Sequence, residues 1–319
     1  MACSRQPGME VDFEEEENFH GRWTAVDSDV VWTDSGAGVL SAVNEGKTKI
    51  EVGQAEKESL LAALEEVASR LHSLSLLCCD LDAPDVVRLG DLLRGTRIQG
   101  IGVSNNPDID VRDWAAFWAK LPVTVTKWDF GDNNLPDEAL PLLLQAACRG
   151  NVQDLLLDGN NFTDISPLLQ VVAQAPNLNE LDIGDNNIGD EQAKALIERL
   201  PGSSLSTLVL GRNFGLTDSS CLSFASVLPR CRIARLYLDS TQITDATLNA
   251  IGGVLSLTQL EELDIDGTLV QDAGLINFCE KVPMSKLRTL EVGDRQLSQQ
   301  ARNAMEAVLD TSNMEDDDL

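Results

Sequence analysis

The stretch "LNELDIGDNNIGDEQAKALIERLP", residues 178–201, decides the fold. Its first half places apolar residues at Leu178, Leu181 and Ile183, followed by Asn186. The alternation at 181–183 predicts a short strand whose apolar side chains point into a core. Its second half has the apolar spacing of a helix and ends at Pro201, which cannot continue a helix. Each such unit therefore predicts one strand, one turn and one helix.

The same pattern returns at regular intervals along the chain. Copies begin at residues 71, 98, 125, 152, 178, 205, 233, 260 and 287, so eight steps cover 216 residues, or 27 each. The pattern is L-x-x-L-x-L-x-x-N/C-x-L, and "LYLDSTQI" (236–243) and "LEELDIDGTLV" (260–270) are two of its later forms. It resembles the leucine-rich repeats, in detail the ribonuclease-inhibitor-like and cysteine-containing subtypes. The resemblance covers about residues 45–310.

This resemblance implies an α/β fold, a leucine-rich-repeat solenoid (horseshoe). Parallel strands would lie on the concave face and helices on the convex face, in about nine 27-residue repeats plus caps. We expect an acidic disordered tail at 1–21, an N-terminal cap at 22–70 made of a hairpin, a strand and a helix, nine repeats at 71–297, a C-terminal cap helix at 298–310, and a second acidic disordered tail at 311–319.

The turns and helices of the repeat carry further signals. An asparagine that follows most strands can both donate and accept, so stacked asparagines can join neighbouring turns. The series is Asn106, Asn133, Asn160, Asn186 and Asn213; it begins with Cys79 and is replaced by Thr241, Thr268 and Arg295, which predicts looser turns there. Asp or Ser before each helix predicts an N-cap. The aromatic run of residues 114–118 we interpret as core packing rather than as a docking site.

Composition excludes several classes of function. Asp and Glu number 52 against 24 Lys and Arg, a net charge of -28. Such a chain repels nucleic acid and anionic membranes and attracts basic proteins. Residues 1–20 lack the apolar segment of a signal peptide, and no run has the length of a membrane span. Seven Cys without a C-x-x-C favour a reducing, cytoplasmic setting without disulfides or zinc. We expect a monomer with no metal and no cofactor.

One motif points to an enzyme. "LDIDGTLV" (263–270) resembles the opening motif of the haloacid dehalogenase phosphatases, in which Asp264 would be the nucleophile and Asp266 the general acid. In the repeat register, however, both are outward positions of one strand, and the spacing is simply strand alternation. Only 53 residues follow Asp266, too few for the α/β domain that these enzymes need. The chain also lacks GxxxxGK[ST], GxSxG and HExxH, so we expect no enzymatic activity.

The outward strand positions predict a binding surface. Of the 27 such positions in nine repeats, ten are acidic and two basic. Carboxylates aligned at strand spacing repel one another, which favours a basic partner over a purely structural role. The sequence therefore predicts a non-enzymatic scaffold or adaptor that holds a basic protein partner in its acidic concave face. The predicted anchors are Leu156, Val209 and Tyr237, with Asp158, Glu180, Asp182, Asp239, Asp264 and Asp266 selecting for charge and Arg212 contributing from the loop edge.

Two alternatives stay open at this point. The Ran GTPase-activating proteins share the repeat type and an acidic C-terminal segment, and act through the loop edge. Carried over to this chain, that resemblance would give functional roles to Asn133, Asn160, Asn186 and Arg212. The second alternative is a tropomodulin-like actin-capping protein, although no tropomyosin-binding helix is evident before the repeats.

Overall fold

The structure is a computed structural model that describes residues 29–293 and 297–308. The chain divides into two compact units, with unit 1 ending at Asn134 and unit 2 beginning at Leu135. Each unit alternates strands with helices, as the repeat predicts. The predicted tails at 1–21 and 311–319 lie outside the described residues.

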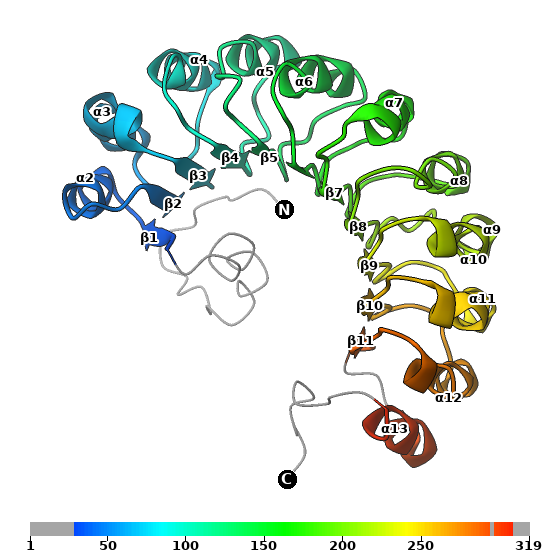
Figure 1. The fold of residues 1–319 in the computed structure, drawn as a ribbon. Coiled ribbons are helices and arrows are strands. Elements are labelled where there is room, and N and C mark those ends of the chain that lie inside the picture. The colour runs from blue at the N-terminus through cyan, green and yellow to red at the C-terminus, as the bar shows by residue number, and fades with distance from the viewer. Residues whose placement is uncertain (1–28, 294–296, 309–319) are drawn as a thin grey trace. The chain divides into compact units, whose positions relative to one another are not determined.

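Unit 1 is built from five parallel strands that follow one another in chain order, with helices covering one face (Figure 1). Its elements are β1 (Val31–Thr33), α2 (Gly36–Asn44), β2 (Lys49–Gly53), α3 (Lys57–Val67), η2 (Ala68–Arg70), β3 (Ser73–Leu77), α4 (Ala83–Leu93), β4 (Gly100–Ser104), α5 (Val111–Trp118) and β5 (Lys127–Asp129). The register is regular, with Leu74 of β3 opposite Ile101 of β4.

Unit 2 continues the pattern with six parallel strands in chain order. Its elements are α6 (Ala139–Ala147), β6 (Asp154–Leu156), α7 (Ser166–Gln174), β7 (Glu180–Asp182), α8 (Asp190–Ile197), β8 (Thr207–Val209), α9 (Asp218–Cys221), α10 (Phe224–Val227), η3 (Leu228–Arg230), β9 (Arg235–Tyr237), α11 (Asp245–Val254), η4 (Leu255–Leu257), β10 (Glu262–Asp264), α12 (Asp272–Cys279), η5 (Val282–Met284), β11 (Thr289–Glu291) and α13 (Gln299–Glu306). Helices again cover one face of the strands (Figure 1).

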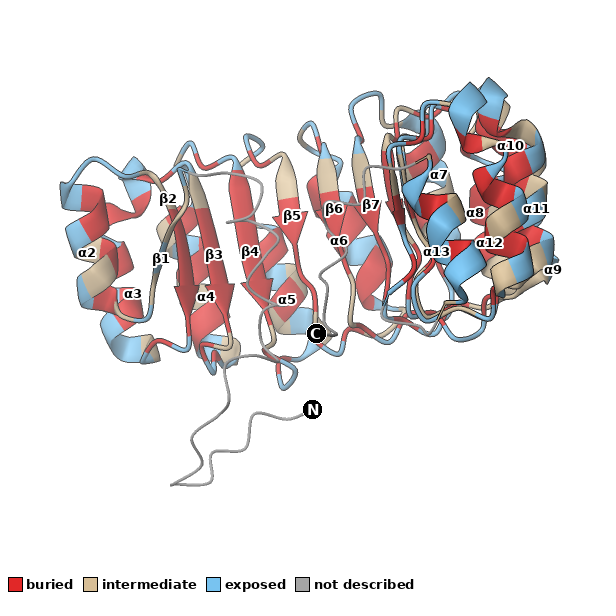
Figure 2. Ribbon diagram, turned by 90° about the horizontal axis from the view of Figure 1, so that it is seen from below, coloured by how far each residue is buried: buried red, intermediate tan, exposed pale blue. Residues whose placement is uncertain are grey.

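The core lies between strands and helices, as the alternation predicts. Leu181 and Ile183 are completely buried, and so are their counterparts in neighbouring repeats. Each helix presents a buried stripe to the strands and an exposed stripe to solvent (Figure 2). In unit 1 the aromatic run packs inward: Trp114 stacks on Trp118 with ring centroids 5.8 Å apart, and Phe130 meets both rings edge-on. The interpretation of this run as core packing is confirmed.

The asparagine ladder forms as predicted. Each Oδ1 accepts a main-chain N–H from the preceding repeat at 2.9–3.0 Å, and each Nδ2 donates to turn carbonyls; the five are Asn106, Asn133, Asn160, Asn186 and Asn213. Thr241 and Thr268 donate only to a carbonyl of their own turn, with no bond to another repeat among the described residues. Arg295 lies outside those residues.

A second ladder joins the helix starts and was not predicted. Aspartates Asp82 and Asp110 are N-caps, as expected. At α9 and α11, by contrast, the N-cap is a threonine, and the following Asp reaches the next repeat. Asp218 accepts from the N–H and the hydroxyl of both Thr244 and Thr247, at 2.6–3.3 Å. These aspartates therefore link adjacent repeats instead of capping their own helix.

Residues 29–47, the described part of 22–47, form a strand and a helix and not the predicted hairpin. Strands β1 and β2 pair in parallel, with Val31 opposite Ile50, and α2 connects them. A hairpin would have required antiparallel strands joined by a short turn. The reason is the apolar face of α2, where Val39 and Val43 are buried and need a helix neighbour, which α3 supplies. Strand-and-helix units thus begin before residue 71.

Candidate functional site

The open face of unit 2 is the face of its strands opposite the helices. Strand alternation directs the first and third residues of β6 to β11 onto it, together with the residue two positions further on. Among the described residues, this face gathers carboxylates at its C-terminal end. We define the C-terminal acidic cluster as Asp239, Glu262, Asp264, Asp266 and Glu291, with the phenol of Tyr237 among them.

The strand register brings these side chains side by side. Tyr237 of β9 lies opposite Asp264 of β10, and Asp264 lies opposite Glu291 of β11. The phenol of Tyr237 donates a hydrogen bond of 2.6 Å to Oε1 of Glu262. Parallel neighbours lie about 4.8 Å apart, so the carboxylates repel one another at close range. This repulsion opposes folding, apart from the hydrogen bond between Tyr237 and Glu262.

The electrostatic consequence is a set of raised pKa values. Burial raises the pKa of Asp264 to about 7, and the charges on Asp239, Glu291 and Asp266 raise it further. The main-chain N–H of Asp266, which donates to Asp264 Oδ1 at 2.8 Å, acts in the opposite direction. The pKa values of Asp239 and Glu291 are also raised, in both cases mainly by burial. A cation against this cluster would relieve the repulsion.

Two cations border the cluster without neutralising it. Arg212 lies 3.5 Å from Asp239, measured from Nε to Oδ2, and its guanidinium is more than half exposed. Arg235 donates from Nε to Thr207 Oγ1 at 3.0 Å. The Asp239 carboxylate leans over Gly211, where an added Cβ would come within 1.8 Å of Oδ1. The absence of a side chain at Gly211 therefore leaves room for the Asp239 carboxylate.

Of the remaining residues predicted to contact a partner, only some are exposed to solvent. Asp158, Glu180 and Val209 are half-buried on the same face. Leu156 and Asp182 lie opposite each other in β6 and β7, and each is only 2% exposed. The prediction of Leu156 as an anchor and of Asp182 as a charge contact is therefore wrong, because neither side chain can be reached. Asp182 instead accepts the N–H of Gly184 at 2.9 Å.

The loop edge also differs from expectation. Asn133, Asn160 and Asn186 are buried in the ladder, so these proposed loop-edge residues cannot act on a partner. Two apolar side chains that the sequence reading missed are exposed there instead. Phe214 is 67% exposed and Leu269 is 49% exposed, in the loops after β8 and β10. Phe214 directly follows Asn213, and Leu269 directly follows Thr268. An apolar residue directly after the Asn or Thr of the repeat was the sequence signal that could have predicted this exposure.

The "LDIDGTLV" segment has the geometry of a repeat. Leu263 and Ile265 are completely buried, while Asp264 and Asp266 point to the opposite side of the strand. The Thr268 hydroxyl donates to Ile265 O at 2.6 Å, as Thr241 does in its own turn. The paired aspartates thus follow from strand alternation. The part of the chain that the structure describes holds no group of three side chains arranged to bind a metal.

The fold and its turns define an α/β solenoid of parallel strands and helices. No family model matches the chain. A stretch of 174 residues, 53% of the chain, is 30% identical to NACHT, LRR and PYD domains-containing protein 13 of Homo sapiens and covers 14% of it. Another of 220 residues, 55% of the chain, is 25% identical to a protein phosphatase 1 regulatory subunit 37 homolog of Caenorhabditis briggsae and covers 24% of it. The chain thus spans less than a quarter of these relatives.

Solved structures agree on the fold. A chain of the Rad7 and Elc1 complex of yeast matches with a TM-score of 0.62 at 16% identity, over 85% of this chain and 74% of that chain. The leucine-rich repeat-containing protein LegL7 of Legionella pneumophila matches with a TM-score of 0.55 at 15% identity, over 88% and 97%. With the repeats, these likenesses show that the chain has the leucine-rich-repeat fold. None of the helices in residues 29–293 and 297–308 has the length and apolar character to cross a membrane.

Proposed function

We propose that the chain is a protein-interaction module that binds a basic segment of a partner protein on the open face of unit 2. The observation that carries this proposal is the C-terminal acidic cluster, in which the partly buried carboxylates of Asp239, Asp264 and Glu291 have raised pKa values. Folding does not require such a cluster, whereas a lysine or arginine of a partner would stabilise its charged form. Asp264 is the centre of the site, because three other acids of the cluster act on it.

The apolar surface beside the cluster gives the partner something to pack against. Val209 lies opposite Tyr237 in the next strand, and both are half-buried on the open face. Aromatic and aliphatic side chains surrounded by charge are typical centres of protein interfaces. The partner segment would place an apolar side chain here and its cations against Asp264 and Asp266. Arg212, beside Asp239, would exchange that carboxylate for an acid of the partner.

The names of similar proteins are in keeping with this role. One relative is named as a regulatory subunit of protein phosphatase 1, and one structural neighbour belongs to a complex of Rad7 with Elc1. Both names refer to proteins that associate with another protein. The proposal for this chain rests on the cluster, since the chain matches only part of each relative.

The test compares two variants in which three acids each are replaced by the corresponding amides. The first carries Asp264→Asn, Asp266→Asn and Glu291→Gln on the open face. The second carries Asp185→Asn, Glu191→Gln and Glu198→Gln, all exposed in the turn and helix of the repeat that begins with β7. Proteins are captured from extract on wild-type and variant baits, after circular dichroism has shown each folded. Removing three cluster charges should weaken a bound basic partner about tenfold or more.

The matched variant distinguishes a site from general attraction to an acidic chain. We expect it to bind the partner as the wild type does, and we expect added salt to release the partner from both. Equal loss in both variants would mean that net charge alone is responsible. Equal retention in both would move the binding surface elsewhere and reject the proposal.

A further inference from the structure

A second surface of opposite charge lies at the edge of unit 2 where β9, β10 and β11 begin. Three loops of equivalent position, residues 230–234, 257–261 and 284–288, lead into these strands. Main-chain hydrogen bonds of 2.8 Å hold them side by side, from Glu261 N–H to Ala234 O and from Arg288 N–H to Glu261 O. Equivalent side chains therefore form rows across this edge.

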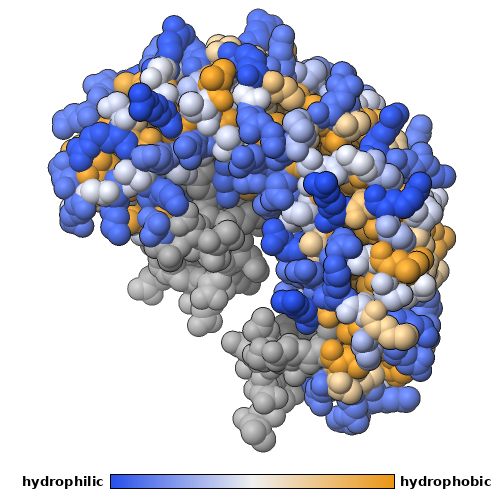
Figure 3. Space-filling model, in the orientation of Figure 1, coloured by the Kyte–Doolittle hydropathy of each residue, from blue (hydrophilic) through white to orange (hydrophobic). Residues whose placement is uncertain are grey.

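One row carries exposed apolar side chains. Leu257 ends η4 and Met284 ends η5, at equivalent positions, and they are 65% and 70% exposed. The core contacts of the same two turns are made by Leu255 and Val282, which are buried. In Figure 3, hydrophobic surface interrupts the hydrophilic colour over the part of unit 2 that carries β9 to β11 and α10 to α12. The fold does not use Leu257 and Met284, which leaves them available to a partner.

The neighbouring positions carry cations. Arg230, Arg232, Lys286 and Arg288 are exposed, and Glu261 is the acid among the three loops. Within the described ranges none of the four cations forms an ion pair. Arg230 donates from Nε to Ser226 O at 3.1 Å, and Lys286 donates to the side chain of Gln259.

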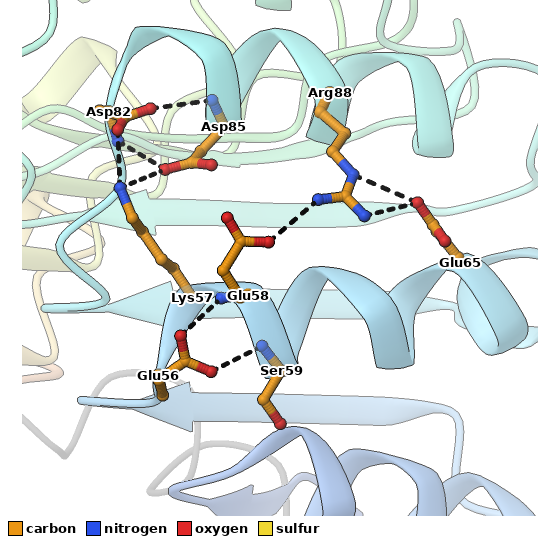
Figure 4. A network of polar contacts seen from close by, with 8 residues as sticks. All are labelled: Glu56, Lys57, Glu58, Ser59, Glu65, Asp82, Asp85 and Arg88. Carbon is orange, nitrogen blue, oxygen red and sulfur yellow. Dashed lines mark hydrogen bonds and ion pairs between the residues drawn. The ribbon is translucent and has the colours of Figure 1, made fainter.

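Cations on the helical side of unit 1 behave differently (Figure 4). Lys57 pairs with Asp82 at 2.6 Å and with Asp85 at 2.9 Å, and Arg88 pairs with Glu65 at 2.6 Å. A chain with a net charge of -28 has ample acids to pair with every cation. What sets this edge apart is that four exposed cations lie beside two exposed apolar side chains in equivalent loops.

We propose that this basic–apolar edge, defined as Arg230, Arg232, Leu257, Met284, Lys286 and Arg288, binds an acidic segment of a partner protein that also carries apolar residues. Charge complementarity pairs the partner's carboxylates with the cations, and its apolar side chains cover Leu257 and Met284. A short acidic segment can contact this edge without also contacting the acidic cluster. Nucleic acid or an anionic membrane presents negative charge over a wide area and would also meet the acidic cluster on the same strands.

The test uses a labelled synthetic peptide of Asp and Glu interrupted by two Leu, with fluorescence anisotropy at about 0.15 M salt, where screening acts beyond about 8 Å. The apolar variant carries Leu257→Ser and Met284→Ser. The charge variant carries Arg232→Gln, Lys286→Gln and Arg288→Gln, and its matched control carries Arg112→Gln, Lys194→Gln and Arg199→Gln, which are exposed elsewhere. We expect the affinity to fall about tenfold in the apolar and charge variants and to stay within about twofold in the control.

Every other outcome overturns the proposal. These are no binding of the peptide by the wild type, the same affinity in all variants, or the same loss in the control. A peptide without Leu should bind more weakly, and equal binding would remove the apolar row from the site. Vesicles of phosphatidylserine and single-stranded DNA are tested in parallel. Edge-dependent binding of either without binding of the peptide would assign the surface to that polyanion instead. The open-face variants do not enter this test, so its result is independent of the proposed function.

Discussion

The phenol of Tyr237 donates a 2.6 Å hydrogen bond to the carboxylate of Glu262, one strand further along the sheet. Burial raises the pKa of Tyr237 above its ordinary value, and the bond to Glu262 raises it further. Tyr237 is the only tyrosine in the chain, so its ionisation can be followed by ultraviolet difference absorbance without assignment. This pair reports directly on the electrostatics of the acidic cluster.

Titration of this phenol is the first prediction. We expect ionisation of Tyr237 clearly above pH 10, the ordinary value for tyrosine being about 10. The substitution Glu262→Gln should lower the pKa, because the carboxylate disfavours tyrosinate as a neighbour. An unshifted titration in the wild type would contradict the closeness of Tyr237 and Glu262.

The stability of the protein should depend on pH through the buried Glu51 and the half-buried Asp264. Asp264 in unit 2 and Glu51 in unit 1 each have a pKa raised to about 7, mainly by burial. The unfolded values are about 4, so the folded state holds these protons more tightly. Their contribution is fully present below about pH 4 and is lost as the pH rises through about 7.

Substitution isolates this effect. We expect Asp264→Asn and Glu51→Gln each to raise the melting temperature at pH 8 and to flatten its decline between pH 5 and pH 8. The measurement is thermal unfolding followed by circular dichroism across that range. A wild-type melting temperature that rises from pH 5 to pH 8 with the same slope in both variants would contradict the raised pKa values.

The bonds between helix starts give a prediction of the opposite sign. Burial alone would raise the pKa of Asp218, but the hydrogen bonds from Thr244 and Thr247 outweigh it and hold the pKa below the ordinary value. The stability from Asp218 is therefore present above about pH 4 and is lost as the pH falls through the lowered pKa. Asp218→Ala should cost about 1–3 kcal/mol in urea denaturation at pH 7. Glu191→Ala, an exposed control, should cost less than about 0.5 kcal/mol; equal effects would argue against the link.

The asparagine ladder predicts unequal costs along the chain. Asn213 accepts from Ile188 N–H at 3.0 Å and donates to Ile183 O at 2.9 Å, which joins two repeats. Thr268 bonds only within its own turn. We expect Asn213→Ala to destabilise the protein by about 2–4 kcal/mol and Thr268→Ala by about 1 kcal/mol. Denaturant unfolding of both variants checks this, and the reverse order would contradict it.

The repeat was readable from sequence because its signals are local and periodic. Leu181, Ile183 and Asn186 have the same environment as their counterparts, so one pattern predicts all of them. Burial on the open face was not readable in this way. Leu156 and Asp182 are outward by alternation, yet each is only 2% exposed, which strand alternation alone does not indicate. The parallel pairing of β1 with β2 was not predicted for a related reason, since alternation does not distinguish parallel from antiparallel strands.

The acidic cluster and the basic–apolar edge differ in how far the sequence indicates them. Three members of the acidic cluster, Asp239, Asp264 and Asp266, were named from the sequence because they are outward positions of adjacent repeats; the register adds Glu262 and Glu291 beside them. The basic–apolar edge arises from equivalent positions in three loops, such as Leu257 and Met284. Comparing the loop residues before each strand, repeat by repeat, would have revealed it. The link from Asp218 to Thr244 depends on side-chain geometry between repeats, which the spacing does not specify.

Photo-crosslinking from defined positions tests most directly whether a basic partner binds the open face of unit 2. A photoreactive amino acid is placed at Val209 or Asp266 on the open face, and at Glu191 or Leu222 on the helical side as controls. The chain is illuminated in extract, and crosslinked peptides are identified by mass spectrometry. We expect crosslinks from Val209 and Asp266 to one lysine- or arginine-rich segment, and we expect them to be lost with Asp264→Asn and Glu291→Gln. Crosslinks to a partner from the helical positions alone would contradict this expectation.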